Sequence, residues 1–188
     1  MPRRPGRPPR STPALQPAQV LATAAALIAA EGLGRFSVRG LARTLSVDPM
    51  ALYHYFPSRS ALLAATADHI FAGLDTPTGS QSWQEQLEEL AAAYILLARQ
   101  HRGLIAALVQ GDIPLEGPVA RFEAALTSAL EGLTLSPAAR AAVRDLVADY
   151  LNGVALAADD SEQWRAGFAI LVAGIGVTAS GTVPSSSR

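Results

Sequence analysis

The stretch SVRGLARTLSVDPMALYHYFPSRSALL, residues 37–63, decides the fold that this sequence predicts. Its first part places Val38, Leu41 and Leu45 at helical spacing, with Arg39 and Arg43 on the opposite side. Asp48-Pro49 then begins a second helix, because Asp is a preferred N-cap and Pro suits the first turn. The pattern predicts two short helices joined by a tight turn and followed, from near Ser58, by a longer helix.

The second of these helices has an unusual outer face. Leu52 and Phe56 are four residues apart and are expected to point inward. The residues left for the outside carry little charge and are small or flat: Pro49, Met50, Ala51, Tyr53, His54 and Tyr55. Such a face makes a poor solvated surface, but it suits a helix that enters a DNA groove.

The order Arg39-x-Leu-Ala-x-x-Leu-x-Val, Ala51-Leu-Tyr-x-Tyr-Phe, Ser58-Arg59 and Leu62-Leu63 resembles the helix-turn-helix of the TetR family of bacterial repressors. The matching positions form one ungapped block, which Glu31-Gly32 precedes at the end of a helix, where that family also turns. Ser46 departs from the pattern, since the family usually has Gly at this turn. A residue other than Gly at positive φ carries a modest strain.

The resemblance implies a set of DNA-binding residues: Ser37, Arg39, Arg43, Pro49, Met50, Ala51, Tyr53, His54, Tyr55 and Arg59. Residues 49–51 cannot donate bidentate hydrogen bonds, so they would read thymine methyl groups and groove shape. Arg59 occupies the position of a phosphate-binding Lys, at the positive end of a helix. Two alternatives stay open: Arg39 is either a DNA contact or part of a solvated face, and Tyr53 is either a contact or an inward-packing residue.

The charge of the chain is divided between its two ends. The 188 residues carry a net charge of −1, but residues 1–60 have eight Arg against Glu31 and Asp48, a balance of +6, and the remainder has −7. A basic front suits binding to phosphates. The chain contains no cysteine, which excludes a disulfide framework and is compatible with a reducing cytosol. We therefore expect a cytoplasmic, nucleoid-associated protein.

Composition also suggests how the chain is divided. Residues 1–16 form a Pro- and Arg-rich arm without the apolar core of a signal peptide, and we expect it to be disordered. It is either a solvated tail or an arm laid in the minor groove of DNA. A DNA-binding domain over 17–74, with the helix-turn-helix at about 37–56, is followed by a break at 75–80. A second domain spans 81–179, and 180–188 is an expected disordered tail.

No stretch alternates apolar and polar residues as a strand would, so the predicted fold class is all-α. The N-terminal three-helix domain with its helix-turn-helix is expected to precede a helical regulatory and dimerisation domain. Ser82 and Glu85 are spaced as a capping box that opens a helix. About nine helices are predicted, at residues 17–30, 38–45, 49–56, 58–74, 83–100, 104–110, 117–131, 137–158 and 161–179.

The last helix carries no charge after Arg165, where its sequence reads AGFAILVAGIGVTA. Its roughly 14 residues are too few to span a membrane, which takes about 20. A helix that is apolar all round must be buried all round, so we weigh a subunit interface above an internal core helix. The resemblance implies that the last two long helices form a four-helix interface in a homodimer. The residues expected there are Val143, Val147, Leu151, Phe168, Leu171 and Ile175.

The resemblance also implies a cavity for a small apolar or amphipathic effector that releases the repressor from a palindromic operator in double-stranded DNA. The candidate lining residues, each of which also fits a plain core position, are Tyr94, His101, Phe122, Tyr150, Asn152, Trp164 and Phe168. The tetracycline repressor holds its drug's magnesium with a histidine on its sixth helix. The corresponding GLIAALVQ has none, so magnesium–tetracycline is not expected.

No cofactor or metal is expected, because His54, His69 and His101 lie far apart in the sequence and there is no Cys. No phosphate-binding glycine loop, nucleophile elbow or pair of catalytic carboxylates is present, so an enzyme is not expected. Three hypotheses remain. The first is a ligand-responsive dimeric repressor, and the second is a DNA-binding regulator controlled by a protein partner or without an effector. The third is a helical protein that does not use DNA.

Overall fold

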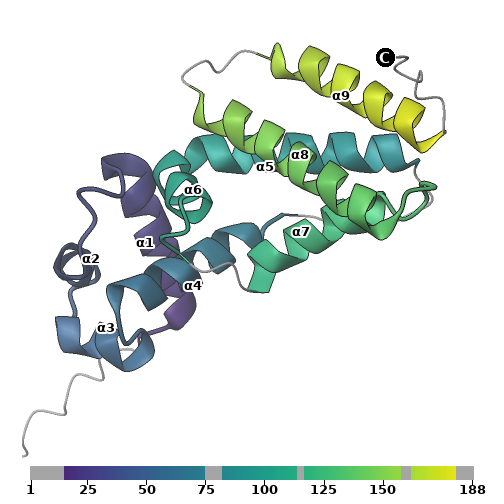
Figure 1. Ribbon diagram of the computed structural model, residues 1–188. Coiled ribbons are helices and arrows are strands. Elements are labelled where there is room, and N and C mark those ends of the chain that lie inside the picture. The colour runs from purple at the N-terminus through teal and green to yellow at the C-terminus, as the bar shows by residue number, and fades with distance from the viewer. Residues whose placement is uncertain (1–14, 75–81, 114–116, 158–161, 181–188) are drawn as a thin grey trace, which may run out of the picture.

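The computed structural model describes residues 15–74, 82–113, 117–157 and 162–180, and within these residues every regular element is a helix. The helices in chain order are α1 (Pro17–Glu31), α2 (Val38–Leu45), α3 (Pro49–Tyr55), α4 (Arg59–Phe71), α5 (Trp83–Gln100), α6 (Arg102–Val109), α7 (Gly117–Ala129), α8 (Pro137–Leu156) and α9 (Trp164–Ala179). The predicted all-α class is thus confirmed. Figure 1 shows α2 and α3 at one end of an elongated molecule, with α8 and α9 at the other.

The N-terminal unit is built around α1, which packs against both α2 and α4. Its core consists of fully buried side chains from all four helices, among them Val20, Leu41, Leu52 and Leu62. Leu41 and Leu52 are the inward residues of the predicted helix pair, so the sequence pattern identified the buried sides of α2 and α3 correctly. Burial of each such side chain stabilises the unit by about 1.5–3 kcal/mol.

The turn between α2 and α3 depends on a serine in the left-handed conformation. Ser46 has φ 56° and ψ 39°, and its N–H donates to the backbone oxygens of Ala42 and Arg43. This is the position at which the sequence departs from the usual Gly, and the backbone adopts positive φ there despite the side chain. The αL conformation of a non-Gly residue costs roughly 1 kcal/mol, so the turn keeps its geometry at a modest cost in stability.

The C-terminal half is organised around α5, which packs against α6, α7 and α8. The predicted capping box begins this helix: the Ser82 hydroxyl accepts from the Glu85 N–H, and the Glu85 carboxylate accepts from the Ser82 N–H at 2.8 Å. The Ser82 backbone N–H and the Ser82 hydroxyl both donate to the Glu85 carboxylate, which holds the pKa of Glu85 below its usual value. The α8 and α9 helices lie side by side.

Several helix ends differ from those predicted. The α4 helix ends at Phe71 rather than near Leu74, α7 ends at Ala129 rather than Glu131, and α6 begins at Arg102, two residues early. The predicted arm (1–16), apart from its last two residues, the break at 75–80 and, except for Ser180, the tail (180–188) lie outside the described residues. The division into domains therefore stays a prediction.

The last helix is buried on one side only. Trp164, Phe168, Val172 and Ile175 face the protein interior, whereas Ile170 is 75% exposed. Among the described residues, no helix is long and apolar enough to cross a membrane. After Arg165, the side of α9 that faces away from the interior is therefore apolar and exposed in the single chain.

The predicted dimer interface needs a correction. Val147, Leu151, Phe168 and Ile175 are all buried within one chain, where they belong to its hydrophobic core. A side chain already enclosed by its own chain cannot contact a second copy, so these four residues were assigned to the wrong side of α8 and α9. Val143 and Leu171 are half-buried. The exposed apolar residues on these two helices are instead Leu146, Leu156, Ile170 and Val177.

Candidate functional site

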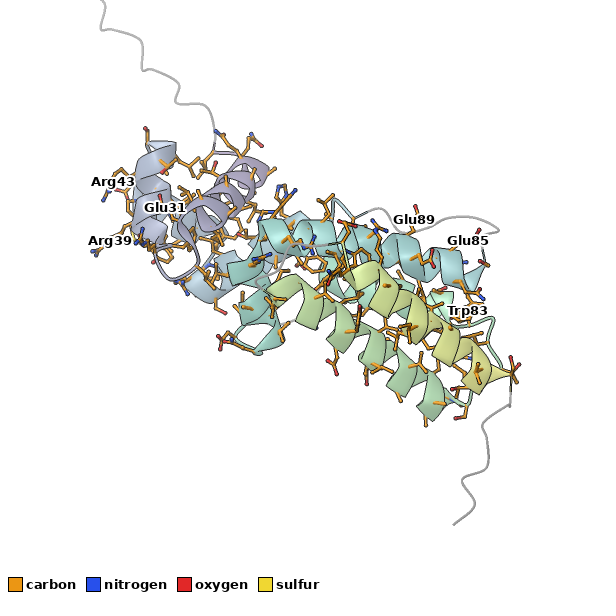
Figure 2. The ribbon with its side chains drawn as sticks, turned by 90° about the horizontal axis from the view of Figure 1, so that it is seen from above. Glu31, Arg39, Arg43, Trp83, Glu85 and Glu89 are labelled. Carbon is orange, nitrogen blue, oxygen red and sulfur yellow. The ribbon has the colours of Figure 1, made fainter. Side chains whose placement is uncertain are left out.

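The outer faces of α2 and α3 form a surface at one end of the molecule. Arg39 and Arg43 are exposed on α2, and Figure 2 shows both side chains pointing away from the rest of the protein. On α3, Met50 is 64% exposed, and Tyr53 and Tyr55 are also exposed. The alternative that Tyr53 packs inside is therefore wrong. This surface combines two cations with large side chains that carry no charge.

Hydrogen-bonded caps fix how these two helices begin. Ser37 caps α2, its hydroxyl accepting from the Gly40 N–H at 3.0 Å. Asp48 caps α3, its carboxylate accepting from the Met50 N–H at 2.7 Å. Pro49 and Ala51 are half-buried beside the exposed Met50, and His54 is exposed farther along the helix. The leading end of α3 is thus held rigidly while it presents an apolar side chain to the solvent.

The side chain of Arg59 contacts other residues of the N-terminal unit, which the sequence did not predict. Its side chain is in contact with the loop between α1 and α2: Nη2 donates to the Leu33 carbonyl at 3.2 Å, and the guanidinium lies over the Phe36 ring at 5.9 Å from its centre. Arg59 therefore stabilises the N-terminal unit itself, as well as placing a positive charge at the first residue of α4. Replacing it would disturb the fold together with any contact to phosphate.

An aromatic pocket lies among the helices of the second half. Phe71 of α4, Tyr94 of α5 and Phe122 of α7 form three of its walls, and Asn152 of α8 lies beside them. Its other lining residues are Leu108, Val109, Glu123, Leu126 and Ala148, and its volume is about 90 Å³. The rings of Tyr94 and Phe122 are stacked with centres 5.0 Å apart, and the Phe71 ring meets Phe122 edge-on at 6.1 Å.

The polar groups of this pocket are paired with each other. The Tyr94 hydroxyl donates to Asn152 Oδ1 at 2.5 Å. Burial raises the pKa of Tyr94 far above its ordinary value, so the hydroxyl stays protonated and neutral. The pocket thus offers a neutral hydroxyl and a neutral amide within an apolar, aromatic surrounding.

The seven predicted pocket residues do not form one pocket. Tyr94, Phe122 and Asn152 come together, but His101 lies at the junction of α5 and α6 and lines a separate groove with α1 and α4. Tyr150, Trp164 and Phe168 form an aromatic cluster between α8 and α9, where the Tyr150 hydroxyl donates to the Trp164 carbonyl at 2.6 Å. The spacing of the seven residues along their own helices could not predict which helices pack against one another.

Several pocket residues were missed by the sequence prediction. Phe71 was assigned to packing in the fourth helix, and Leu108 and Val109 were seen only as part of a short apolar helix. Glu123 and Ala148 gave no signal, because an acid or a small residue on an amphipathic helix is usually at the surface or in the core. Among the described residues there is also no group of three or more side chains that could hold a metal ion.

The sequence of the N-terminal unit is similar to known families and proteins. Residues 20–66 match the model of bacterial regulatory proteins, tetR family, and this segment contains α2, α3 and the surface they present. The HTH-type transcriptional repressor DrrR1 of Streptomyces coeruleorubidus is 33% identical over 120 residues. That alignment covers 63% of this chain but only 43% of DrrR1, so the chain spans less than half the length of that relative. The matched family and this relative are both named as regulators of transcription.

Solved structures share the fold over most of the chain. BioQ in complex with its natural double-stranded DNA operator is 27% identical, with a TM-score of 0.72, and the match covers 87% of this chain and 99% of BioQ. BioQ of Mycobacterium smegmatis is 28% identical with a TM-score of 0.73 over 87% and 98% of the two chains. ActR of Streptomyces coelicolor, solved with actinorhodin, is 19% identical with a TM-score of 0.73 over 88% and 98%, and this likeness concerns the fold alone. Residues 20–66 thus match the helix-turn-helix segment of the tetR family of bacterial regulatory proteins, and the described residues share the fold of these solved structures.

Proposed function

We propose that this chain is a transcriptional repressor that binds operator DNA as a homodimer and is released by a small molecule. The observation that carries the proposal is the surface of α2 and α3, where Arg39 and Arg43 are exposed on α2 and Met50, Tyr53 and Tyr55 are exposed on α3. Arginines suit phosphates and base edges, whereas Met50 and its neighbours suit thymine methyl groups. DrrR1 is named a repressor and BioQ was solved on its operator, which supports the same role here.

Dimerisation supports this role, because one helix-turn-helix reads few base pairs and a two-fold pair reads a palindrome. The face proposed for the contact between copies is the exposed apolar side of α8 and α9, with Leu146, Leu156, Ile170 and Val177. In such a dimer, the two DNA-binding surfaces would lie at the ends away from α8 and α9 (Figure 1). The protein would act in the cytoplasm, where it meets the chromosome.

Two helices link the aromatic pocket to the DNA-binding surface. The α4 helix begins at Arg59, beside the loop that holds α2, and ends at Phe71 in the pocket wall. The α6 helix lines the pocket with Leu108 and approaches the α1–α2 loop so closely that a Cβ at Gly103 would lie 3.3 Å from Leu33. A ligand that displaces the pocket walls would therefore move the helix-turn-helix through α4 and α6, which is our proposed route of release.

The DNA contacts are tested by selecting bound sequences from random duplex DNA and measuring the affinity for the selected site by fluorescence anisotropy. Arg39→Ala and Tyr53→Ala are suitable variants, because both side chains are exposed. We expect each to weaken binding about tenfold or more, the effect of losing roughly 1–3 kcal/mol at a DNA contact. Light scattering would check that both variants keep the oligomeric state of the wild type.

The matched control is Arg121→Ala, which removes the same charge from an exposed position on α7. We expect the affinity of this variant for the selected site to stay close to that of the wild type. If Arg121→Ala weakens binding as much as Arg39→Ala does, the α2–α3 surface is not the DNA contact, and only a general electrostatic effect remains.

A further inference from the structure

The aromatic pocket of Phe71, Tyr94, Phe122, Glu123 and Asn152 has a charge character that restricts what it can hold. Among the described residues that line it, Glu123 is the one acidic residue, and neither Arg nor His takes part. The two polar groups inside are a neutral hydroxyl and a neutral amide that are bonded to each other. An anion placed here would lose its hydration without gaining a positive partner, which is costly.

The rings add to the preference against negative charge. The faces of Phe71, Tyr94 and Phe122 carry the negative side of the aromatic quadrupole, which attracts cations and repels anions. Glu123 is exposed and belongs to the pocket lining, so its carboxylate is available to a positive group at the opening. The ring faces and the carboxylate thus favour the same charge.

Shape restricts the ligand further. The rings of Tyr94 and Phe122 stack on each other with an angle of 15° between their planes, and a flat molecule can extend such a stack. The free volume of about 90 Å³ is well below the roughly 300–1,000 Å³ that holds a drug-sized ligand. A polycyclic ligand must therefore displace at least one ring, and these rings are carried by α4, α5 and α7.

We infer that the effector of this protein is a flat aromatic cation, whose rings lie against Phe71, Tyr94 and Phe122 and whose positive charge faces Glu123. This inference rests on the proposed function, in that it names the ligand class of the release mechanism. It does not depend on the identity of the operator, because the preference for positive charge belongs to the pocket alone.

The test compares two xanthene dyes of similar ring size and opposite charge, rhodamine 6G as the cation and fluorescein as the anion. Binding to the full chain without DNA is followed by fluorescence anisotropy. We expect rhodamine 6G to bind at least about tenfold more tightly than fluorescein. Equal or tighter binding of fluorescein, or no binding of rhodamine 6G, would overturn the inference.

Two variants test whether Glu123 causes the preference for the cationic dye. Glu123→Gln should weaken rhodamine 6G binding about threefold or more and leave fluorescein no weaker, since the change removes an exposed negative charge that attracts the cation. Glu131→Gln removes the same charge from the exposed turn after α7 and should change neither dye. Equal effects of the two variants on rhodamine 6G would also overturn the inference. Failure of the proposed function would appear separately, as absence of binding to any selected DNA.

Discussion

Gly167 lies in α9 where the side chain of Tyr150 packs against this helix. A Cβ built there would lie 2.5 Å from the Tyr150 hydroxyl, which donates to the Trp164 carbonyl. Gly is otherwise unfavourable within a helix by about 1 kcal/mol relative to Ala. Its presence in the first turns of α9 is therefore explained by the space that the tyrosine occupies.

This explanation predicts a change of sign between two backgrounds. In the wild type, Gly167→Ala should lower the free energy of unfolding by on the order of 1 kcal/mol, because overcrowding outweighs the gain in helix propensity. With Tyr150→Phe already present, the hydroxyl is absent and the same change should be neutral or stabilising. Urea denaturation of the four proteins measures both effects. Destabilisation of equal size in both backgrounds would show that the hydroxyl is not the cause.

Single residues also show what a sequence can and cannot predict. The caps Ser37, Asp48 and Ser82 were predictable, because a cap bonds to a backbone group two or three residues away. The hydrogen bond from Arg59 to the Leu33 carbonyl joins residues 26 apart. Such a contact depends on how α1 and α4 pack, and no local pattern encodes it. Arg59 was accordingly read as a DNA contact alone.

Among the helices, α9 shows that composition alone cannot predict which side of a helix is buried. Its lack of charge predicted a buried helix, and one side is indeed buried, with Phe168 and Ile175 in the core. Apolar residues occur at every angle around it, so periodicity could not identify the side that faces α8. The residues of α9 predicted for the dimer interface therefore included some from its buried side. The pocket shows the same limit, since only the packing of α4 against α7 brings Phe71 to Phe122.

The outer side of α9 can be tested by a single charge. We expect Ile170→Asp to produce a monomer, because an aspartate in place of a 75% exposed isoleucine would be buried without a partner in the dimer. Leu96→Asp is the matched control, as Leu96 is 64% exposed on α5 and lines the groove next to α1 and α4. Light scattering should give a monomer for the first and a dimer for the second. A dimer from Ile170→Asp would exclude the α8–α9 face as the interface.

At the scale of the whole molecule, charge and shape agree. Within the described residues 15–60, four arginines stand against the two acids Glu31 and Asp48, and α2 and α3 of this segment occupy one end of an elongated molecule (Figure 1). Arg39 and Arg43 point outward at that end, whereas the acids Glu85 and Glu89 lie on α5 in the other half (Figure 2). Such a separation orients the protein toward a polyanion before any specific contact forms.

The salt dependence of operator binding tests whether the protein binds DNA through contacts to phosphates. The affinity of the full chain for its selected duplex is measured by anisotropy over a series of salt concentrations. If the dimer contacts about six to ten phosphates, affinity should fall by roughly 10³- to 10⁵-fold between about 50 and about 200 mM salt. An affinity that changes less than about tenfold over this range, or no binding to any selected duplex, would show that the protein does not bind DNA in this way.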